Sequence, residues 1–162
     1  MIRKMTAEDA PRVLDIYKMG LETHNATFET KVPTWADWDA KHHRHSRFVF
    51  VEDERVLGWV ALAPTSARKV YAGVAEVSVY VDTNASGKGI GSKLMARVIA
   101  SSEEKGIWTL YSSVFPENKA TVRLHEKFGF RIIGKREKIA KLDGHWRDTI
   151  LLERRSILIG TE

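Results

Sequence analysis

The feature that most constrains the fold is a glycine-rich run, SGKGIGSKL, which occupies residues 86–94. The alternating apolar run VAEVSVYVD before it predicts a strand over 74–82, and the periodic run after it predicts a helix that ends near Lys105. Glycines let backbone N–H groups approach an anion, and the first turn of a helix adds unpaired N–H groups and partial positive charge. Taken alone, the run predicts a phosphate cradle or a plain strand-to-helix turn about equally.

Two familiar phosphate-binding patterns do not fit this run. The P-loop pattern G-x-x-x-x-G-K-[ST] fails because no glycine lies five residues before Gly87 and no Ser or Thr follows Lys88. The dinucleotide pattern G-x-G-x-x-G fails because the glycines are spaced G-x-G-x-G and lie past the middle of the chain. The identity of any ligand must therefore come from neighbouring segments.

Other runs place this unit within a larger α/β pattern. Thr34 and Asn118 are typical helix N-caps, and Asp143-Gly144 predicts a tight turn between the last two strands. The order of elements predicts one α/β domain over residues 1–162, with a central mixed sheet between helices on both faces. The expected strands cover 1–6, 47–52, 56–64, 74–82, 107–115, 130–142 and 146–155, and the expected helices cover 8–22, 34–46, the stretch from the glycine run to about 105, and 118–128.

The composition excludes several kinds of chemistry. The chain has no cysteine, so disulfides, thiolate metal sites and cysteine nucleophiles are ruled out. It has no N-terminal signal run and no apolar run approaching the roughly 18 residues of a membrane span, so we expect a soluble cytoplasmic protein without a membrane partner. The net charge of +5 is spread along the chain without an aromatic platform, so we expect no nucleic-acid partner.

A histidine-rich run, KHHRHSR at residues 41–47, invites a metal-site interpretation. His42 and His45 would share one face of the predicted helix, but no carboxylate or third ligand accompanies them at a suitable spacing. We therefore expect a solvated helix end and no metal. Trp35 and Trp38 have the same i, i+3 spacing, which indicates packing.

Two side chains outside the glycine run could carry acid–base chemistry. Glu76 lies on the strand face opposite Val77 and Val79, where a domain covered on both faces would bury it. Burial raises the pKa of a carboxyl group, as a general base requires, although a lone strand glutamate is more often solvated. His125 flanks the apolar stripe of the 118–128 helix and should be partly buried, although a single helix histidine more often lies at the surface.

Three elements in this order resemble the GNAT superfamily of N-acetyltransferases: the strand EVSVYVD, the loop SGKGIGSKL and the segment PENKATVRLHEKFGF. Within it the chain is similar to the phosphinothricin N-acetyltransferase family, which includes methionine sulfoximine acetyltransferases, through ATFET, AEVSVYVD, NKATVRLHEKFGF and DGHWRD. The resemblance covers nearly the whole chain. It implies acetyl-CoA as co-substrate, no metal, a splayed and mostly antiparallel central sheet, and a homodimer.

The resemblance implies a role for each part of the cofactor site. The glycine run would bind the pyrophosphate of acetyl-CoA through backbone N–H groups, and the backbone of the preceding strand would pair with the pantetheine arm. One departure is Ser86, where the superfamily has Arg or Gln, and Lys88 would compensate in part. The implied cofactor-binding residues are Val79, Tyr80, Val81, Gly87, Lys88, Gly89, Ile90, Gly91, Ser92 and Asn118.

The resemblance also implies direct attack of a neutral amine on the thioester. Glu76 would be the base, acting through water, and His125 would protonate the leaving thiolate or offer the proton a second route. The implied acceptor is a small amino acid of the phosphinothricin, methionine sulfoximine or methionine sulfone type, and the alternative is a protein, peptide or other amine. The candidate acceptor-binding residues are Phe28, Glu29, Arg68, Tyr71 and Trp146.

Overall fold

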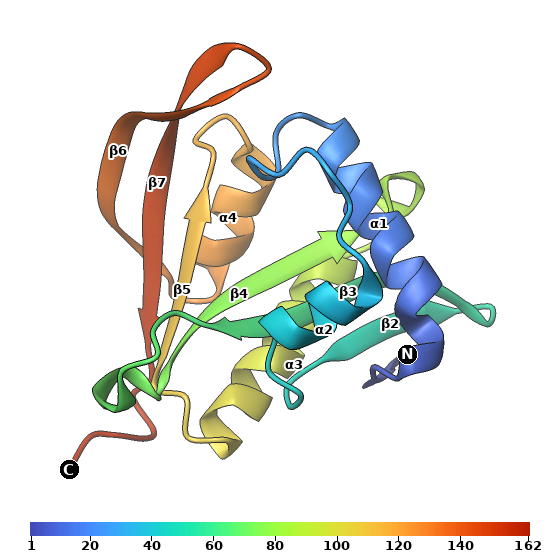
Figure 1. Cartoon of the computed structure of the whole chain (residues 1–162). Coiled ribbons are helices and arrows are strands. Elements are labelled where there is room, and N and C mark those ends of the chain that lie inside the picture. The colour runs from blue at the N-terminus through green and yellow to red at the C-terminus, as the bar shows by residue number, and fades with distance from the viewer.

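The computed structural model describes residues 1–162 and is built on one seven-stranded sheet (Figure 1). The strand order is β1-β2-β3-β4-β5-β7-β6. Only β4 and β5 are parallel, so the expected mixed, mostly antiparallel sheet is confirmed. The strands are β1 (Ile2–Lys4), β2 (Phe48–Glu52), β3 (Arg55–Pro64), β4 (Val74–Val81), β5 (Thr109–Val114), β6 (Arg131–Leu142) and β7 (His145–Arg155).

Helices cover both faces of this sheet, as expected. Two helices, α1 and α2, pack on one face, and α3 and α4 lie on the other (Figure 1). Thr34 and Asn118 cap α2 and α4 as predicted, each accepting a hydrogen bond from the backbone N–H three residues later. The helices are α1 (Ala10–Glu22), α2 (Trp35–Lys41), α3 (Ile90–Glu104) and α4 (Lys119–Lys127), and the short 3-10 turns are η1 (Ala7–Asp9), η2 (Lys69–Tyr71) and η3 (Thr83–Ala85).

Strand β3 separates the two halves of the hydrophobic core. Val60 and Leu62 belong to the large cluster on the α3 side, whereas Trp59 packs in the smaller cluster with α1 and α2. Residues 56–63 are all buried, because both faces of the strand are covered. The indole N–H of Trp59 donates to the carbonyl oxygen of Val13 at 3.0 Å, so this strand also holds α1 against the sheet.

The segment after α2 differs from the expectation. The helix predicted over 34–46 ends at Lys41, and His42 has extended backbone angles, φ −105° and ψ 149°. The guanidinium of Arg47 donates to the carbonyl oxygens of Asp39 and His42, which holds the segment folded back on the helix end. His42 and Arg47 are buried, so the prediction of a solvated helix end was wrong.

Strands β4 and β5 run side by side over only three residues each, Val74–Glu76 and Thr109–Tyr111. Beyond Glu76, β4 continues to Val81 and pairs only with β3. The two strands diverge from this point (Figure 1), which confirms the splayed sheet. One backbone edge of β4 therefore faces an opening in the sheet rather than a neighbouring strand.

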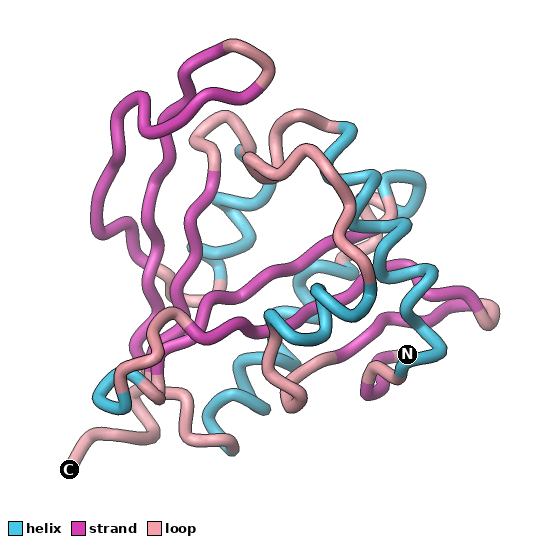
Figure 2. The backbone as a smooth tube through the Cα atoms, viewed as in Figure 1, coloured by secondary structure: helices cyan, strands magenta, loops and turns pink.

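The connection between α1 and α2, residues 23–34, runs past this opening (Figure 2). The backbone carbonyl of Asn25 accepts a hydrogen bond from the side chain of Asn118 at 3.2 Å. The side-chain oxygen of Asn25 accepts a second hydrogen bond, from Arg147 of β7, at 2.9 Å. These contacts tie the connection to elements on the β5 side of the opening, while its two ends belong to helices packed on the β3–β4 side.

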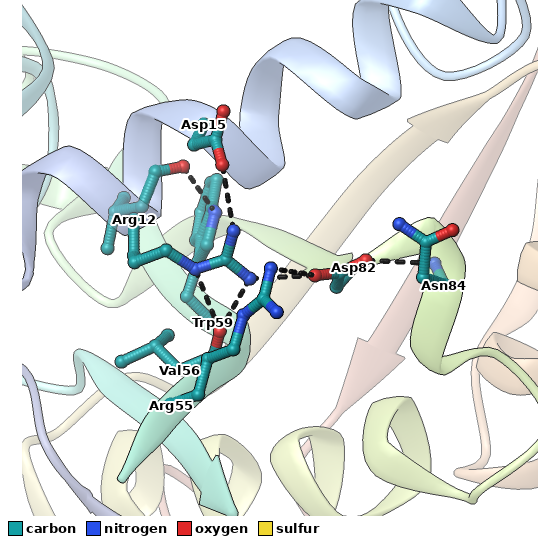
Figure 3. A network of polar contacts seen from close by, with 8 residues as sticks. Arg12, Asp15, Arg55, Val56, Trp59, Asp82 and Asn84 are labelled. Carbon is teal, nitrogen blue, oxygen red and sulfur yellow. Dashed lines mark hydrogen bonds and ion pairs between the residues drawn. The ribbon is translucent and has the colours of Figure 1, made fainter.

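A buried ion pair fixes the chain just before the glycine run (Figure 3). Arg12 of α1 donates to Asp82 at 2.7 Å, and it also donates to the carbonyl oxygen of Val56 and to Asp15. Asp82, whose side chain is 2% exposed, accepts a further bond from the backbone N–H of Asn84 and so begins η3. Burial by itself would raise the pKa of Asp82, but the bonds from Arg12 and Asn84 outweigh it and lower that pKa.

Replacing Asp82 with Asn should destabilise the fold by about 3 kcal/mol, the low end for a broken buried pair, because Arg12 is partly exposed. The lowered pKa means that the carboxylate stabilises the fold fully above its unfolded pKa of about 4 and loses this effect as the pH falls further. Urea unfolding of the wild type and Asp82→Asn should therefore converge in acid.

The matched control is Asp15→Asn, which removes the exposed partner of the same arginine. Its effect should stay below about 1 kcal/mol, as for other exposed ion pairs. A D82N destabilisation that did not change between pH 7 and pH 3 would contradict the assigned ion pair.

Candidate active site

A cavity of about 840 Å³ occupies the opening between β4 and β5. Its lining comes from those two strands, the glycine run, the start of α3, the helices α1, α2 and α4, and the 23–34 connection. Glu76, Asn118 and His125 all line this one cavity, together with six residues of the glycine run. The structure therefore brings the groups assigned to acid–base chemistry to the same space as those assigned to phosphate binding.

The glycine run has the geometry of an anion cradle. Gly87 and Gly89 have left-handed backbone angles, φ 81° and 73°, and Gly89 is the N-cap of α3. No atom lies within 4 Å of the place where a Cβ would stand on either glycine, so the backbone there is open to a ligand. The first bond of the helix runs from the N–H of Lys93 to the carbonyl of Gly89, which leaves the N–H groups of residues 90–92 without helical partners. Such N–H groups, with the helix dipole, suit a phosphate group.

All of the predicted cofactor-binding residues line the cavity except Lys88. Lys88 forms an ion pair with Glu52 at 3.0 Å, beside a second cavity of about 250 Å³. The lysine that contacts the glycine run is instead Lys127 of α4, whose ammonium donates to the hydroxyl of Ser92 at 3.2 Å. Sequence analysis missed Lys127, because nothing in its own helix links it to a loop 35 positions earlier.

Glu76 is the last β4 residue that pairs with β5, and it lines the cavity. Its carboxylate has no hydrogen bond or ion pair with the protein. Burial raises the pKa of Glu76, and the positive charge of Lys41 offsets part of that rise. A carboxylate with a raised pKa that borders a cavity is a stronger base than a solvated one.

His125 is 4% exposed in α4 and packs edge-to-face on Phe130. Its Nδ1 lies 2.7 Å from the carbonyl oxygen of Thr121, which can only accept, so Nδ1 carries the proton. Nε2 then presents a lone pair, and it is buried without a partner in the protein. Burial lowers the pKa of His125, and the bond to Thr121 only partly opposes this. The neutral ring has no proton to donate at Nε2. This favours His125 as a second route for the proton over His125 as the acid that protonates the thiolate.

Among the predicted acceptor-binding residues, only Glu29 lines the cavity. Phe28 lies directly behind the lining, packed edge-to-face at 4.9 Å on Phe115, which does line the cavity. The other three lie farther out. Arg68 and Tyr71 are exposed, with the guanidinium 5.5 Å from the phenol ring centre. Trp146 is 57% exposed on the β6–β7 hairpin.

Aromatic rings, of which sequence analysis assigned only Tyr80 to the site, form one wall of the cavity. Tyr80 stacks on Trp59 at 4.9 Å and meets the edge of Tyr17 at 5.1 Å. Trp38 stacks on His42 at 4.0 Å, and all five rings line the cavity. The tryptophan spacing in α2 correctly indicated packing, but only the tertiary contacts show that this packed face borders the site.

The structure contains neither a membrane-spanning helix nor a metal site. Its helices are all too short or too polar to span a bilayer. No group of three or more His, Cys, Asp or Glu side chains is arranged to hold a metal ion. His43 and His45 do stack on each other at 4.7 Å, yet no third ligand joins them.

The glycine cradle at the start of α3 and the carboxylate at the splayed sheet define an acetyltransferase, and the comparison with known families agrees. The model of the Acetyltransferase (GNAT) family matches residues 10–130. The chain belongs to this family, and the resemblance drawn from its motifs is confirmed. It is therefore an N-acetyltransferase.

Three known proteins show how close the similarity is. The phosphinothricin N-acetyltransferase of Streptomyces viridochromogenes is 31% identical over 91% of this chain and 82% of that protein. The L-methionine sulfoximine/L-methionine sulfone acetyltransferase of Pseudomonas paraeruginosa is 27% identical over 94% of this chain and 92% of that protein. The crystal structure of a ribosomal-protein-alanine N-acetyltransferase from Brucella melitensis has a TM-score of 0.90 and 26% identity, over 96% of this chain and 99% of that chain.

Replacing Gly89 with Ala should weaken acetyl-CoA binding about 10- to 100-fold, the effect of losing one charged hydrogen bond. The added Cβ stands in open space, where it would hold a phosphate away from the N–H groups of α3. Isothermal titration with CoA measures the change.

Gly106→Ala is the control for backbone strain. Gly106 also has a left-handed backbone, φ 79°, and open space at its Cβ position, but it lies at the other end of α3 and does not line the cavity. Both variants should lose about 1–2 kcal/mol of stability through the strained conformation. Equal CoA affinities in the two variants would rule out the cradle.

Replacing Glu76 with Gln should lower kcat/KM at neutral pH about 10²- to 10⁴-fold, the usual effect of removing a general base. Part of the activity should return at higher pH, where more of the amine is already neutral. The pH profile of kcat/KM measures this, and an unchanged profile would remove Glu76 from the mechanism.

The same variant tests the raised pKa without any assay of activity. A carboxyl group whose pKa is raised by folding stabilises the fold below its unfolded value, near 4.5, and loses that effect as the pH rises. Glu76→Gln should therefore unfold at a higher temperature than the wild type at pH 7, and this advantage should shrink towards pH 4. An advantage that grew in acid would contradict the burial of the carboxyl group.

Proposed function

We propose that this protein transfers the acetyl group of acetyl-CoA to the amino group of a small amino-acid-like acceptor. The observation that carries the proposal is the single cavity in which the unpaired carboxylate of Glu76 and the open N-terminus of α3 meet. Relatives named for phosphinothricin, methionine sulfoximine and methionine sulfone support an acceptor of that type. All three acceptors are amino acids with a polar tetrahedral group in the side chain.

The residues present fit acetyl-CoA. The N–H groups of residues 90–92 and the open backbone at Gly87 and Gly89 would hold its pyrophosphate. The free edge of β4 beyond Glu76 would pair with the amides of the pantetheine arm, because backbone groups at a sheet edge need partners. Asn118 lines the cavity and is held as an N-cap, so its place there is set by the fold.

The protein's own contribution to the chemistry is to move a proton and stabilise charge. Bound acetyl-CoA supplies an acetyl group activated as a thioester. The acceptor amine must lose its proton before it can attack, and Glu76 takes that proton directly or through one water molecule. Backbone N–H groups of β4 that face the opening would stabilise the negative charge that develops on the acyl oxygen.

His125 provides a second place for a proton to rest. Its Nε2 carries a lone pair, because Nδ1 donates to Thr121, and the ring is neutral at pH 7 since burial lowers its pKa. To protonate a leaving thiolate, Nε2 must first receive a proton from the amine or from Glu76. His125 therefore relays a proton rather than supplying one of its own.

The assembly and location of the enzyme follow the same resemblance. We propose a homodimer in the cytoplasm, as the phosphinothricin family resemblance implies. The exposed isoleucines of the edge strand β6, Ile132, Ile133 and Ile139, support a partner on that side of the molecule.

A protein or peptide amine is the second candidate acceptor. The observation that favours it is the Brucella neighbour, which is named for acetylation of a ribosomal protein. The deciding test is a thiol-release assay with acetyl-CoA against phosphinothricin, methionine sulfoximine, methionine sulfone, polyamines, aminoglycosides and short peptides that begin with alanine.

The expected result is turnover of the three amino acids with kcat/KM at least about 10-fold above that of every peptide, since missing polar contacts carry penalties of this size. Turnover of peptides alone would establish the second candidate. If none of the amines in the panel causes thiol release while CoA still binds, a non-catalytic acyl-CoA-binding protein would be the better description.

A further inference from the structure

Six charged side chains line the cavity; Asp82 is held by Arg12, and the other five, of both signs, have no ion-pair partner. Four come from the 23–34 connection and α2, and the fifth is the base of the proposed mechanism. None of the five makes an ion pair, and none of their side chains makes a hydrogen bond within the protein, so each is free to meet a ligand. The five residues are Glu29, Lys31, Asp37, Lys41 and Glu76.

The signs of these charges restrict the ligand. A polyamine would need only the carboxylates, and a simple carboxylic acid would need only the lysines. A zwitterionic amino acid presents an ammonium and a carboxylate on the same carbon, so it can use both. Because the two groups share one carbon, the lysine that meets the carboxylate must lie close to the base that meets the amine.

Lys41 is the lysine whose backbone is fixed, and its exposed side chain borders the cavity. It is the last residue of α2, and the next side chain, His42, is 8% exposed and stacked on Trp38. His42 Nδ1 donates to the carbonyl oxygen of Trp38 at 2.7 Å, which locks the ring. The following N–H, of His43, donates to the carbonyl of Leu62 at 2.8 Å. The backbone on the C-terminal side of Lys41 is thus anchored to the helix and to β3.

The anchor point on β3 lies beside the base. Leu62 pairs with Val77 of β4, and the next residue, Ala63, pairs with Glu76. Ala61 and Ala63 lie on the strand face that Glu76 shares and are buried, so the anchor of Lys41 and the base belong to the same covered face of the sheet. The charge of Lys41 already acts on the carboxyl of Glu76 and lowers its pKa, which agrees with this placement.

We propose that Lys41 binds the α-carboxylate of the acceptor, so that the site selects amino acids with a free carboxylate next to the reacting amine. The proposal rests on the proposed amino-acid acetyltransferase function and names the residue behind its selectivity. Arg68 and Tyr71, the cationic and phenolic groups that the sequence suggested for an anionic acceptor, lie outside the cavity. Lys41 takes the place of that expected contact.

The test compares methionine sulfone with its α-carboxamide, which keeps the amine and the side chain but lacks the negative charge. The wild type should favour the free acid about 10- to 100-fold in kcat/KM, the effect of one charge-assisted hydrogen bond. Lys41→Gln should abolish this preference by raising KM for the acid, with the carboxamide almost unaffected. Lys41→Arg, which keeps the charge, should retain most of the preference.

Lys18→Gln is the matched control, because Lys18 is an exposed lysine of α1 outside the cavity. It should leave both rates unchanged. Equal losses for acid and carboxamide in Lys41→Gln would show a structural role and overturn the proposal, as would a preference that survives the substitution. If the wild type acetylates the carboxamide as well as the acid, the carboxylate contact is wrong while the acetyltransferase function stands. If it acetylates neither compound nor phosphinothricin nor methionine sulfoximine, both fail.

Discussion

The short pairing between β4 and β5 is the constraint on which the rest of the molecule depends. Three residues of each strand pair, and the strands then separate, so the sheet opens next to Glu76. Backbone groups at such an opening must find partners in solvent or ligand, since unpaired buried groups are costly. The opening creates the cavity, and it also leaves Glu76, the proposed base, at the point where the last pair holds the strand in place. A fully paired sheet would have neither feature.

The fold has to hold together around this gap without closing it. On one side, the Arg12–Asp82 pair fixes α1 to the end of β4, immediately before the glycine run. On the other, Arg147 and Asn118 bind the 23–34 connection through Asn25. Together with the edge-to-face packing of Phe28 on Phe115, these polar contacts bridge the two sides of the gap. Specific hydrogen bonds at its rim therefore position the acceptor side relative to the cofactor side.

Sequence reasoning succeeded where the information is local. The caps at Thr34 and Asn118 and the glycine run are each contained in a few consecutive residues, and the structure has them where they were predicted. It failed for the end of α2, because the carbonyls that terminate this helix are satisfied by Arg47, which lies beyond it. The acceptor side was mostly missed for the same reason: Lys41 reaches the site only through a tertiary contact between His43 and β3.

Burial shifts the pKa values of Glu76 and His125 in opposite directions, yet it leaves both groups able to accept a proton. It raises the pKa of Glu76 and lowers that of His125, because a low-dielectric surrounding disfavours the charged form of each. Glu76 becomes a stronger base, and His125 becomes a neutral ring whose Nε2 accepts. In the proposed mechanism, the proton that leaves with the thiol is therefore the one removed from the amine. That mechanism couples deprotonation of the acceptor to protonation of the leaving group, without a separate acid.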